Sequence, residues 1–471
     1  MRQTWIVFIR FALLAGLLIP AGRTAAQESE PQGPVYIVQP GDTLWDIAQR
    51  FGVPWDQLAS ANGILDVSLL AAGDELIIPG IQGIEGVLVT ERIPFGENLT
   101  SLSRRYQVPE EILVRLNHLA SPARLYSGAS LIVPEDRATS DPKRASLSSG
   151  ESLLELAAGE GLNPWSVVLR NDLRGSWEAL PGEGLRLPVP GGGQDMGPGG
   201  LPDAISLAEM ESAPLVQGDT GVIRLKTEGE IELGGSLFDR DLNFLKDGED
   251  GYVALQGVHA MADPGLYPLT LRGRLADGTP FSFEQMVPVQ AGDFRYFTLN
   301  VPPETIDPAN TKPEDEIWMG LAQPVTQEKM WDGIFQTPVA QPSPCGFTSF
   351  YGERRSYNGS PYNYFHTGLD FCYNYNLEVN EIYAPADGVV VFAGPMTVRG
   401  NATMIDHGWG VYTGYMHQEE IYVKEGDRVE AGQAIGAAGE TGRVSGPHLH
   451  FEVFVGGVQV DPMRWLEQDF P

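Results

Sequence analysis

The segment Pro447-His448-Leu449-His450-Phe451-Glu452-Val453 decides how the C-terminal part of the chain folds. Polar and apolar residues alternate along it, which predicts a half-buried strand with His448, His450 and Glu452 on one face. Two shorter motifs precede it, His366-Thr-Gly-Leu-Asp370 and Tyr415-Met416-His417, and five of the seven histidines fall in the last 106 residues. This clustering predicts a metal site.

The residue types in these motifs suit a divalent cation. Zinc accepts imidazole nitrogen and carboxylate oxygen, and a catalytic site uses three protein ligands so that water can take the fourth position. Gly368 disfavours a helix between His366 and Asp370, so we expect these two residues to converge from a strand and the turn beside it. One histidine of the strand can then bind the ion while the other transfers protons.

The three motifs, in this order, resemble the lysostaphin-type (LytM-like) zinc endopeptidases, which cut peptide bonds in bacterial peptidoglycan. The resemblance extends from about Phe335 to Leu466 and includes Ala384-Pro-Ala-Asp-Gly-Val and Ile405-Asp-His-Gly. It implies one Zn2+ per peptidase domain. Family members often carry a tyrosine shortly before the first ligand, and Tyr362 and Tyr364 compete for that position here.

Carried over residue by residue, the resemblance implies two sets of roles. The zinc ligands would be His366, Asp370 and His450, and the catalytic pair would be His417 and His448. A histidine with a pKa near 6.5 can take a proton from water, donate one to the leaving amine or hydrogen-bond the oxyanion. Which histidine of the pair is the base stays open.

The other histidines have structural interpretations. His407 lies in Asp406-His407-Gly408-Trp409-Gly410, where Gly and Asp suit a turn between strands without any chemistry. His118 and His259 lie in unrelated segments and are expected to be surface or packing residues.

Length and composition indicate a modular globular protein. The chain has 471 residues, enough for three or four domains, with 42% hydrophobic and 20% charged residues. Its formal net charge of -31 argues against sequence-independent binding to nucleic acid or anionic lipid, because both depend on clustered Lys and Arg.

The N-terminus has the pattern of a cleavable secretory signal. Met1 and Arg2 precede a short apolar run, and Thr24-Ala25-Ala26 offers small residues before Gln27, so we expect a signal peptide at residues 1–26. An uncleaved anchor is the alternative. The predicted location is extracytoplasmic, either secreted or in the bacterial cell envelope, without stable membrane insertion after cleavage. In that compartment Cys345 and Cys372 are expected to form a disulfide, the alternative being two buried free thiols.

A threefold repeat occupies the first part of the chain. From Gly41, Gly96 and Gly150 the same residue types recur at fixed offsets, including Asn62, Asn117 and Asn171 at 21 positions. Each copy is predicted to fold as strand, helix, helix, strand. The copies cover residues 34–80, 86–135 and 145–190.

The first copy, from Tyr36-Ile-Val-Gln-Pro-Gly-Asp-Thr-Leu-Trp-Asp-Ile-Ala to Ile78-Pro79, resembles the lysin motif (LysM), and the other two resemble diverged copies. The resemblance implies binding of N-acetylglucosamine polymers, although core packing alone would also preserve the repeat frame. Loops on a small scaffold usually carry binding. The candidate glycan contacts are Gly41, Asp42, Thr43, Asn62, Gly63 and Ile64.

The rest of the chain connects these repeats to the predicted enzyme. Residues 191–200 are expected to be a flexible Gly-rich linker, and residues 201–303 an all-β, immunoglobulin-like spacer. The acidic stretch Asp239–Asp250 is interpreted as a solvated loop rather than a calcium site, because it lacks the EF-hand spacing. Residues 304–335 are predicted to be a linker with short helices at Glu314–Leu321 and Thr326–Trp331, before a mainly antiparallel β peptidase domain at 336–471.

These patterns and the two family resemblances together imply a secreted zinc metalloendopeptidase that hydrolyses peptidoglycan stem peptides or cross-bridges and is targeted to the wall by its lysin-motif repeats. Two alternatives stay open: a non-catalytic wall-binding adaptor, and an activator of another peptidoglycan hydrolase.

Overall fold

The computed structural model describes residues 33–81, 84, 86–135, 143–188, 197–303, 306–339 and 346–471. The chain forms two compact units, Met1–Gln82 and Gly83–Pro471. The predicted signal peptide at 1–26, Cys345 and residues 191–196 of the predicted linker lie outside the described residues.

The first unit has the predicted order of strand, helix, helix and strand. Thr43 caps the first helix by accepting a hydrogen bond from the Asp46 amide, and Gly52 ends it in the left-handed conformation. The two strands pair antiparallel, with Val35 opposite Ile77. The elements are β1 (Val35–Ile37), α1 (Leu44–Phe51), α2 (Trp55–Ala61), the 3-10 helix η1 (Val67–Leu69) and β2 (Glu75–Ile77).

The second and third repeats, which belong to the second unit, have the same order. The second contains β3 (Val87–Arg92), α3 (Leu99–Tyr106), α4 (Glu110–Leu116), η2 (Pro122–Arg124) and β4 (Ser130–Pro134). The third contains β5 (Lys143–Ser146), α5 (Leu153–Gly159), α6 (Pro164–Arg170) and β6 (Gly184–Leu187).

The asparagine shared by all three repeats has a structural role. Asn62 Nδ2 donates to the Leu58 and Ile77 carbonyls, at 2.9 and 2.8 Å, and its Oδ1 accepts from the Ile77 amide at 2.6 Å. Asn117 and Asn171 make the same three bonds: one to the carbonyl four positions earlier and two to the residue 15 positions later. This side chain therefore fastens the second helix of each repeat to its return strand.

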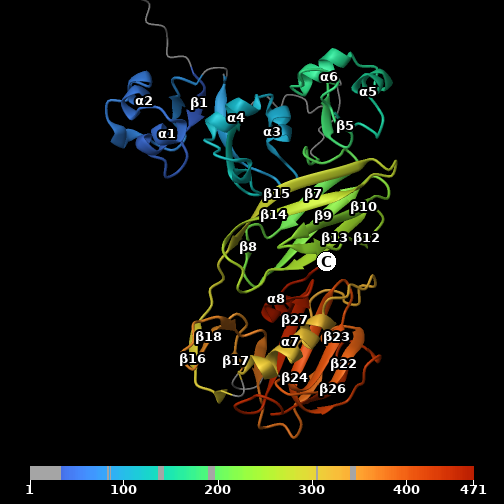
Figure 1. Cartoon of the computed structure of the whole chain (residues 1–471). Helices are drawn as coiled ribbons and strands as arrows, with labels where there is room; N and C mark the ends of the chain where they lie inside the picture. The colour runs from blue at the N-terminus through green and yellow to red at the C-terminus, as the bar shows by residue number, and fades with distance from the viewer. Residues whose placement is uncertain are drawn as a thin grey trace, which may run out of the picture. The chain divides into compact units, whose positions relative to one another are not determined.

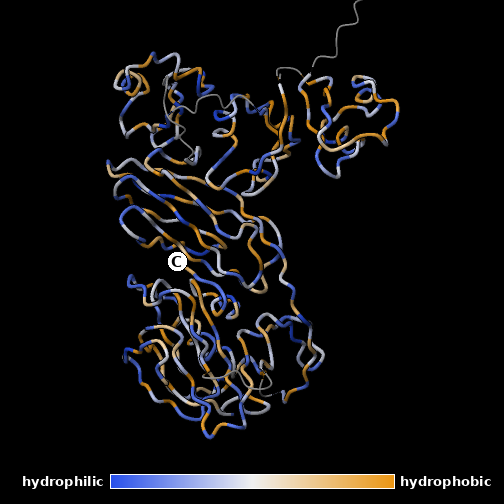
Figure 2. Tube along the Cα trace, turned by 180° about the vertical axis from the view of Figure 1, so that it is seen from behind, coloured by the Kyte–Doolittle hydropathy of each residue, from blue (hydrophilic) through white to orange (hydrophobic). Residues whose placement is uncertain are grey.

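Two sheets follow the repeats and enclose a shared hydrophobic core. One has the strand order β11-β10-β14-β15-β8 and the other β12-β13-β9-β7. Burial alternates along β15, as expected for a strand with one face on a core, and the tube in Figure 2 changes repeatedly between orange and blue along these strands. The strands are β7 (Ile205–Glu211), β8 (Leu215–Val216), β9 (Thr220–Thr227), β10 (Glu232–Leu237), β11 (Arg240–Leu242), β12 (Leu245–Asp247), β13 (Gly251–Gly257), β14 (Gly265–Arg274) and β15 (Pro280–Gln290).

The predicted all-β character of this region is confirmed, but two local expectations are wrong. The acidic stretch Asp239–Asp250 is not a loop, because β11 and β12 form within it and pair with neighbouring strands. The run around Phe294 does not join the two sheets. Its strand β16 (Tyr296–Leu299) pairs parallel with β18 (Arg354–Tyr357) near the C-terminal domain.

The end of the predicted Gly-rich linker also differs from a free coil. The Gly199 amide donates to Glu97 Oε1 at 3.2 Å, and the Gly200 amide donates to the Gly96 carbonyl at 2.9 Å. Arg144 Nη1 donates to the Pro198 carbonyl at 2.8 Å. Residues without bulky side chains let these backbone groups approach the second and third repeats closely.

The helix that precedes the C-terminal sheet is longer than predicted. It is α7 (Pro308–Leu321), which begins after the capping residue Asp307. The second predicted helix, Thr326–Trp331, does not form. Its backbone instead bonds to the turn around His407: the Trp409 amide donates to the Thr326 carbonyl and the Met330 amide donates to the His407 carbonyl.

The C-terminal region is built on an antiparallel sheet, as predicted, and α7 lies across one face of it (Figure 1). The main strand order is β17-β20-β27-β24-β23-β22-β25. The strands are β17 (Phe347–Ser349), β20 (Leu369–Cys372), β27 (His448–Val455), β24 (Val411–Ile421), β23 (Gly400–Asp406), β22 (Gly388–Met396) and β25 (Arg428–Val429), with β21 (Glu381–Tyr383), β26 (Ala434–Ala438) and β28 (Val458–Val460) at its margins. β19 (Tyr364–Phe365) pairs with β18, and α8 (Pro462–Glu467) follows the sheet.

The two-sheet region packs directly against this C-terminal sheet. Val222, Val253 and Leu255 belong to the same buried cluster as Phe451 and Trp465. Trp465 Nε1 also donates to Thr220 Oγ1 at 3.1 Å, and the Asp461 amide donates to the Gly218 carbonyl at 2.8 Å. The expected spacer therefore shares a core with the domain that follows it.

We expect Asn171→Ala to lower the local stability of the third repeat by about 2 kcal/mol, because a buried carbonyl and amide lose their partner. Hydrogen–deuterium exchange of the β6 amides measures this loss in the full chain. Ser166→Ala, at an exposed position on α6, is the control and should leave exchange unchanged. Equal β6 protection in both variants would contradict the structural role of this asparagine.

Candidate metal centre

Three predicted ligands converge on one point. β20 and β27 pair antiparallel with Asp370 opposite His450, and His366 reaches the same place from the turn between β19 and β20. His366 Nε2 lies 3.0 Å from Asp370 Oδ1 and 3.0 Å from His450 Nδ1, and His450 Nδ1 lies 2.7 Å from Asp370 Oδ1. One ligand atom from each residue lies within 4.8 Å of the others, and all three residues are buried.

Gly368 makes this convergence possible. A Cβ at this position would lie 2.3 Å from the Phe451 carbonyl oxygen and 2.8 Å from His450 Nε2. Only glycine lets the turn pass so close to β27. The sequence-based expectation that His366 and Asp370 meet across a strand and its adjoining turn is confirmed.

Hydrogen bonds determine which nitrogen of each histidine faces the centre. His366 Nδ1 lies 2.9 Å from the Phe350 carbonyl, so it carries the proton and leaves the Nε2 lone pair for a cation. His450 is turned the other way, with Nδ1 toward Asp370 and Nε2 3.3 Å from Glu452 Oε1. Two imidazole lone pairs and one carboxylate oxygen therefore face a common point.

Electrostatics keep Asp370 ionised. Burial raises its pKa, but His366 and His450 hold the pKa of this carboxyl well below its ordinary value. Burial lowers the pKa of His366 despite the nearby carboxylate. Burial acts in the same direction on His450, but its bonds to Asp370 and Glu452 raise its pKa to about 9. The centre thus offers an anionic oxygen ligand at neutral pH.

His417 and His448 lie beside the three ligands, with ring centroids 4.9 Å apart. The Nδ1 atom of His417 lies 2.8 Å from the Thr441 carbonyl, and that of His448 lies 2.9 Å from the Gly446 carbonyl. Each neutral ring therefore donates through Nδ1 and keeps an Nε2 lone pair. Burial, reinforced by the neighbouring histidines, lowers the pKa of His417 to about 3, so the ring is neutral at neutral pH.

The two candidate tyrosines are exposed and lie at the sheet formed by β16, β18 and β19. Tyr362 contacts the Tyr296 ring, with centroids 5.1 Å apart, and its hydroxyl lies 3.1 Å from Thr298 Oγ1. Tyr364 packs against Tyr357 instead. Neither arrangement favours one of them for the family position.

The remaining predicted histidines lie apart from this centre. His407 is fully buried, with Nδ1 2.7 Å from the Asp387 carbonyl and Nε2 2.7 Å from Thr413 Oγ1. His259 packs on Phe365, and His118 is exposed in the second repeat. Their interpretation as structural or surface residues agrees with these contacts.

Cys372 is disulfide-bonded and lies opposite His448 in the sheet. Its predicted partner Cys345 is outside the described residues, so the pairing with Cys345 stays a prediction.

Side chains among the candidate glycan contacts are largely occupied within the first repeat. Asp42 accepts hydrogen bonds from the Tyr36 hydroxyl and Arg50, Thr43 caps α1, and Asn62 binds the return strand. Gly41 and Gly63 are exposed turn residues with positive φ, and the amides of Gly63 and Ile64 donate to the Ser60 and Ala59 carbonyls. The exposed residues Trp45, Trp55 and Leu65 of this repeat were not predicted as contacts.

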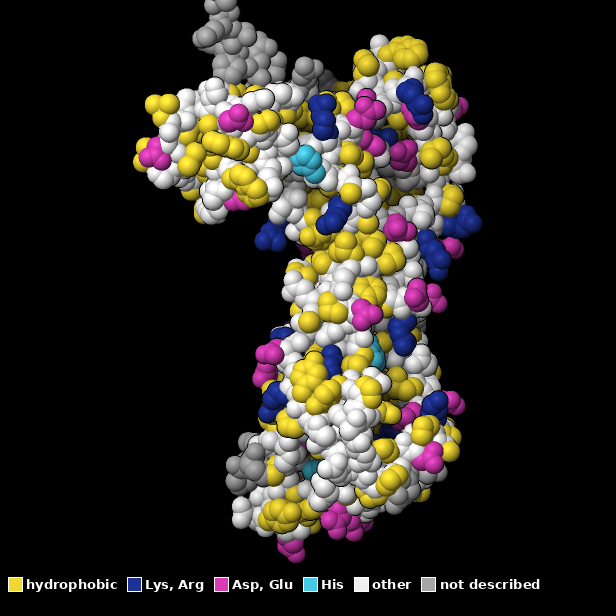
Figure 3. Space-filling view, turned by 60° about the vertical axis from the view of Figure 1, so that its left-hand side comes forward, with side chains coloured by type: hydrophobic (Ala, Val, Ile, Leu, Met, Phe, Trp, Pro, Cys, Tyr) yellow, Lys and Arg dark blue, Asp and Glu magenta, His cyan; other side chains and the backbone are white. Residues whose placement is uncertain are grey.

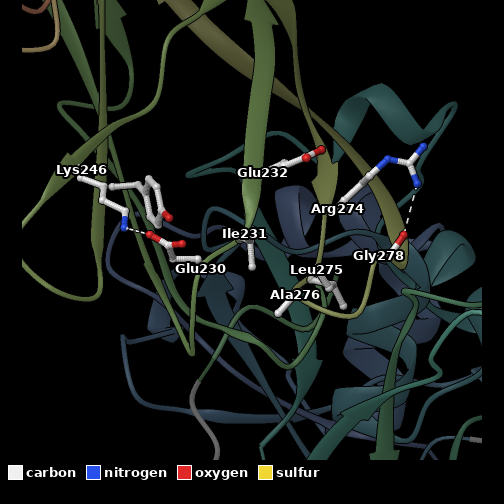
Figure 4. Close-up of a pocket in the computed structure, with 9 residues that line it drawn as sticks. Glu230, Ile231, Glu232, Lys246, Arg274, Leu275, Ala276 and Gly278 are labelled. Carbon is white, nitrogen blue, oxygen red and sulfur yellow. Dashed lines mark hydrogen bonds and ion pairs between the residues drawn. The ribbon is translucent and has the colours of Figure 1, made fainter.

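A separate pocket lies at one end of the two-sheet region (Figure 4). Within it, Lys246 pairs with Glu230, and Arg274 Nη1 donates to the Gly278 carbonyl at 3.2 Å. On the face in Figure 3, basic and acidic side chains are interspersed rather than gathered by sign. The pocket brings together none of the histidines or cysteines of the chain.

Comparison with known proteins supports both resemblances. Residues 364–462 match the model of Peptidase family M23, and residues 36–79 and 93–134 match the LysM domain. The chain therefore carries an M23 metallopeptidase domain and two LysM domains. No helix in the described part of the chain is long and apolar enough to cross a membrane.

Two of the curated relatives are endopeptidases by name. The peptidoglycan DD-endopeptidase ShyA of Vibrio cholerae is 43% identical over 99 residues, which cover 21% of this chain and 22% of the relative. The DD-carboxypeptidase/endopeptidase Mpg of Neisseria meningitidis is 43% identical over 98 residues, with the same coverage. The chain thus spans about a fifth of the length of these relatives. The solved catalytic domain of lysostaphin from Staphylococcus simulans is 28% identical, with 32% of this chain and 97% of that chain covered and a TM-score of 0.21.

The buried His407 predicts a pH dependence of stability. Burial lowers its pKa to about 4, whereas the unfolded chain titrates near 6.5. The stability that it contributes is complete above pH 6.5 and falls by about 3 kcal/mol as the pH drops to 4, because only the unfolded state takes up the proton. We expect His407→Gln to be less stable at pH 7 but to lose about 3 kcal/mol less between pH 7 and 4.

Urea unfolding of chelator-treated protein, followed by fluorescence of the tryptophan cluster around Trp331, Trp409 and Trp465, measures this difference. Identical pH slopes for the variant and the parent chain would contradict it.

Proposed function

We propose that the chain is a zinc-dependent endopeptidase that hydrolyses peptide bonds of bacterial peptidoglycan. The observation that carries this proposal is the convergence of two imidazole nitrogens and one carboxylate oxygen beside a second pair of histidines. The M23 match and the names of the curated relatives support the same activity. We extend to this chain the DD-endopeptidase activity that those names state.

We further propose that His366, Asp370 and His450 hold the metal, and that this metal is zinc. Their donor set fits Zn2+, which binds imidazole nitrogen and carboxylate oxygen with similar ease. Two neutral imidazoles and one carboxylate leave a divalent cation with net positive charge. When bound, zinc supplies a Lewis acid that polarises the scissile carbonyl and lowers the pKa of water towards about 7.

His417 and His448 move the protons in this proposal. Each presents an Nε2 lone pair, because its Nδ1 hydrogen is held by a backbone carbonyl. One ring takes a proton from the attacking water, and a protonated ring donates to the leaving amine. The protonated rings can also hydrogen-bond the oxyanion of the tetrahedral state.

The LysM repeats would hold the enzyme on its substrate by binding N-acetylglucosamine-containing glycan. In the first repeat we assign this contact to the backbone turns at Gly41 and Gly63 and to Ile64, because Asp42, Thr43 and Asn62 are engaged internally. Diverged LysM units at 86–135 and 145–190 and an immunoglobulin-like region at 201–303 complete the arrangement. Because peptidoglycan lies outside the cytoplasm, the proposal also includes a cleaved signal at 1–26 and an extracytoplasmic location in the bacterial envelope.

The proposal predicts chelator-sensitive release of new amino termini from purified peptidoglycan, because the reaction needs the bound cation. We expect His450→Ala to lose both zinc and activity. His448→Ala should keep stoichiometric zinc while its rate falls by about 100- to 10,000-fold, because it removes a proton-transfer group rather than a ligand. Elemental analysis and muropeptide chromatography measure the two quantities.

His118→Ala, an exposed substitution away from the centre, is the matched control and should keep full activity. Wall binding without release of amino termini would reject the enzyme in favour of the adaptor. Release that requires a second hydrolase would favour the activator.

A further inference from the structure

A buried carboxylate joins helix α7 to the metal centre. Glu452 is fully buried, and its Oε1 lies 3.3 Å from His450 Nε2 and 3.0 Å from the donor Gln459 Nε2. Its other oxygen, Oε2, accepts a hydrogen bond from Trp318 Nε1 of α7 at 2.8 Å. Trp318 is itself fully buried and lies against Gly414 of β24.

This carboxylate fixes the orientation of His450. A buried charge requires donors on both oxygens, and here they come from an indole, an amide and an imidazole. With Glu452 accepting at Nε2, His450 keeps a hydrogen there, so Nδ1, which faces Asp370, is the nitrogen that is placed to bind a cation. Removing the carboxylate would leave the ring free to adopt the other tautomer.

The same helix also supports the proton-transferring side of the centre. Glu314 of α7 accepts hydrogen bonds from the Val398 and Arg399 amides, both at 2.9 Å, and from Arg399 Nη1 at 3.1 Å. The Arg399 carbonyl then accepts from the His417 amide at 2.9 Å. His417 has a φ of 62°, a conformation that needs such external support.

We propose that Glu452, held by Trp318, is a positioning residue that sets His450 for metal binding, and that α7 is thereby part of the metal centre. α7 lies upstream of the matched peptidase segment at 364–462. The proposal rests on the proposed function only in taking zinc as the metal. It concerns metal affinity and therefore stands or falls separately from peptidase activity.

Zinc affinity, measured by competition with a chromophoric chelator, tests this proposal. We expect Glu452→Gln to raise the zinc Kd by about 10- to 100-fold and Trp318→Phe to raise it by about 3- to 10-fold. The double variant should fall short of the product of the two, because both act through one contact chain. The visible spectrum of the cobalt-substituted protein should shift in the same variants.

Ile317→Ala, at an exposed position on the same helix, is the control and should leave both readouts unchanged. Melting of the metal-free proteins shows that each variant is folded. If Glu452→Gln does not fold, Trp318→Phe, which keeps an aromatic ring, tests the proposal through the same zinc Kd and cobalt spectrum. An unchanged Kd and cobalt spectrum in the folded variants would overturn the proposal.

A second, independent observation concerns an arginine at the edge of the centre. Arg355 of β18 is half-buried, and its Nη2 donates to Ser349 Oγ at 2.9 Å. Ser349 pairs with Asp370 in the sheet, so the guanidinium lies close to the ligand cluster. Its proximity also contributes to the lowered pKa of His366, after burial as the main cause.

Arg355, unlike Arg295, has no ion-pair partner among the residues that the structure describes. Arg295 forms an ion pair with Glu353, and the buried Arg354 donates to the Ala260 carbonyl. Within the described residues, no carboxylate oxygen lies within 4.0 Å of a nitrogen of Arg355. In a chain with a net charge of -31, a cation without an ion-pair partner beside the reaction centre is a candidate anion-binding group.

We propose that Arg355 binds a free carboxylate of the substrate peptide next to the scissile bond. A guanidinium offers two parallel N–H donors that match a carboxylate, and peptidoglycan peptides carry carboxylates that can be amidated. This proposal rests on the proposed function, because it names a feature of the same substrate. Arg355 then determines specificity for the acid over the amide form.

Two synthetic peptides that differ only in a free carboxylate or a primary amide test this assignment. We expect the parent chain to favour the acid in kcat/KM by about 10- to 100-fold, and Arg355→Gln to abolish that preference while cleaving the amide at a similar rate. Arg355→Lys should keep part of the preference. Arg428→Gln makes the same charge change at an exposed site and should keep all of it.

Equilibrium binding of both peptides to His448→Ala separates this proposal from the activity itself. A tighter Kd for the acid, lost when Arg355→Gln is added, supports the role of Arg355 even if no peptide is cleaved. Equal binding of the acid and the amide would overturn it.

Discussion

The antiparallel pairing of β20 with β27 is the constraint on which the catalytic region depends. It places Asp370 opposite His450 and Cys372 opposite His448. His448 and His450 of β27 therefore face the centre, and Asp370 of β20 completes it. A slip of one residue would turn every side chain of a strand to the other face. The buried residues Phe451 and Val453, which alternate with the histidines, prevent that slip because they belong to the core.

Charge inside this core is balanced by neighbouring groups rather than by solvent. Asp370 and Glu452 lie on opposite sides of the His450 ring, and the ring's two nitrogens therefore have different partners. The donors that satisfy Glu452 come from α7 and from Gln459. His366, His417 and His448 also donate through their Nδ1 atoms to the carbonyls of Phe350, Thr441 and Gly446, which sets the orientation of these three rings in advance.

The region between the repeats and the peptidase is more than a connection. Val222 and Leu255 share a buried cluster with the peptidase sheet. The second repeat contacts strand β15, where Phe95 packs on Phe283 and the Gly96 amide donates to Gln285. The second repeat is thus fastened to the β-sandwich, which is fastened to the enzyme. Residues 197–200 are held by hydrogen bonds and are not a free coil, so they do not act as a flexible tether that would let the enzyme act on a distant part of the substrate.

The sequence by itself determined the repeat frame and the β-rich C-terminal domain, because both depend on local spacing and periodicity. It also predicted the five histidine and aspartate positions of the centre, through three short motifs and the family that they resemble. Only the tertiary structure decided the direction of each imidazole, the contact between Glu452 and Trp318, and the separation of Arg355 from the carboxylates of the described residues. These features join residues as far apart as 134 positions, and no local pattern encodes such contacts. For the same reason the sequence misassigned Thr326–Trp331 as a helix: its backbone is held by the turn around His407, more than seventy positions later.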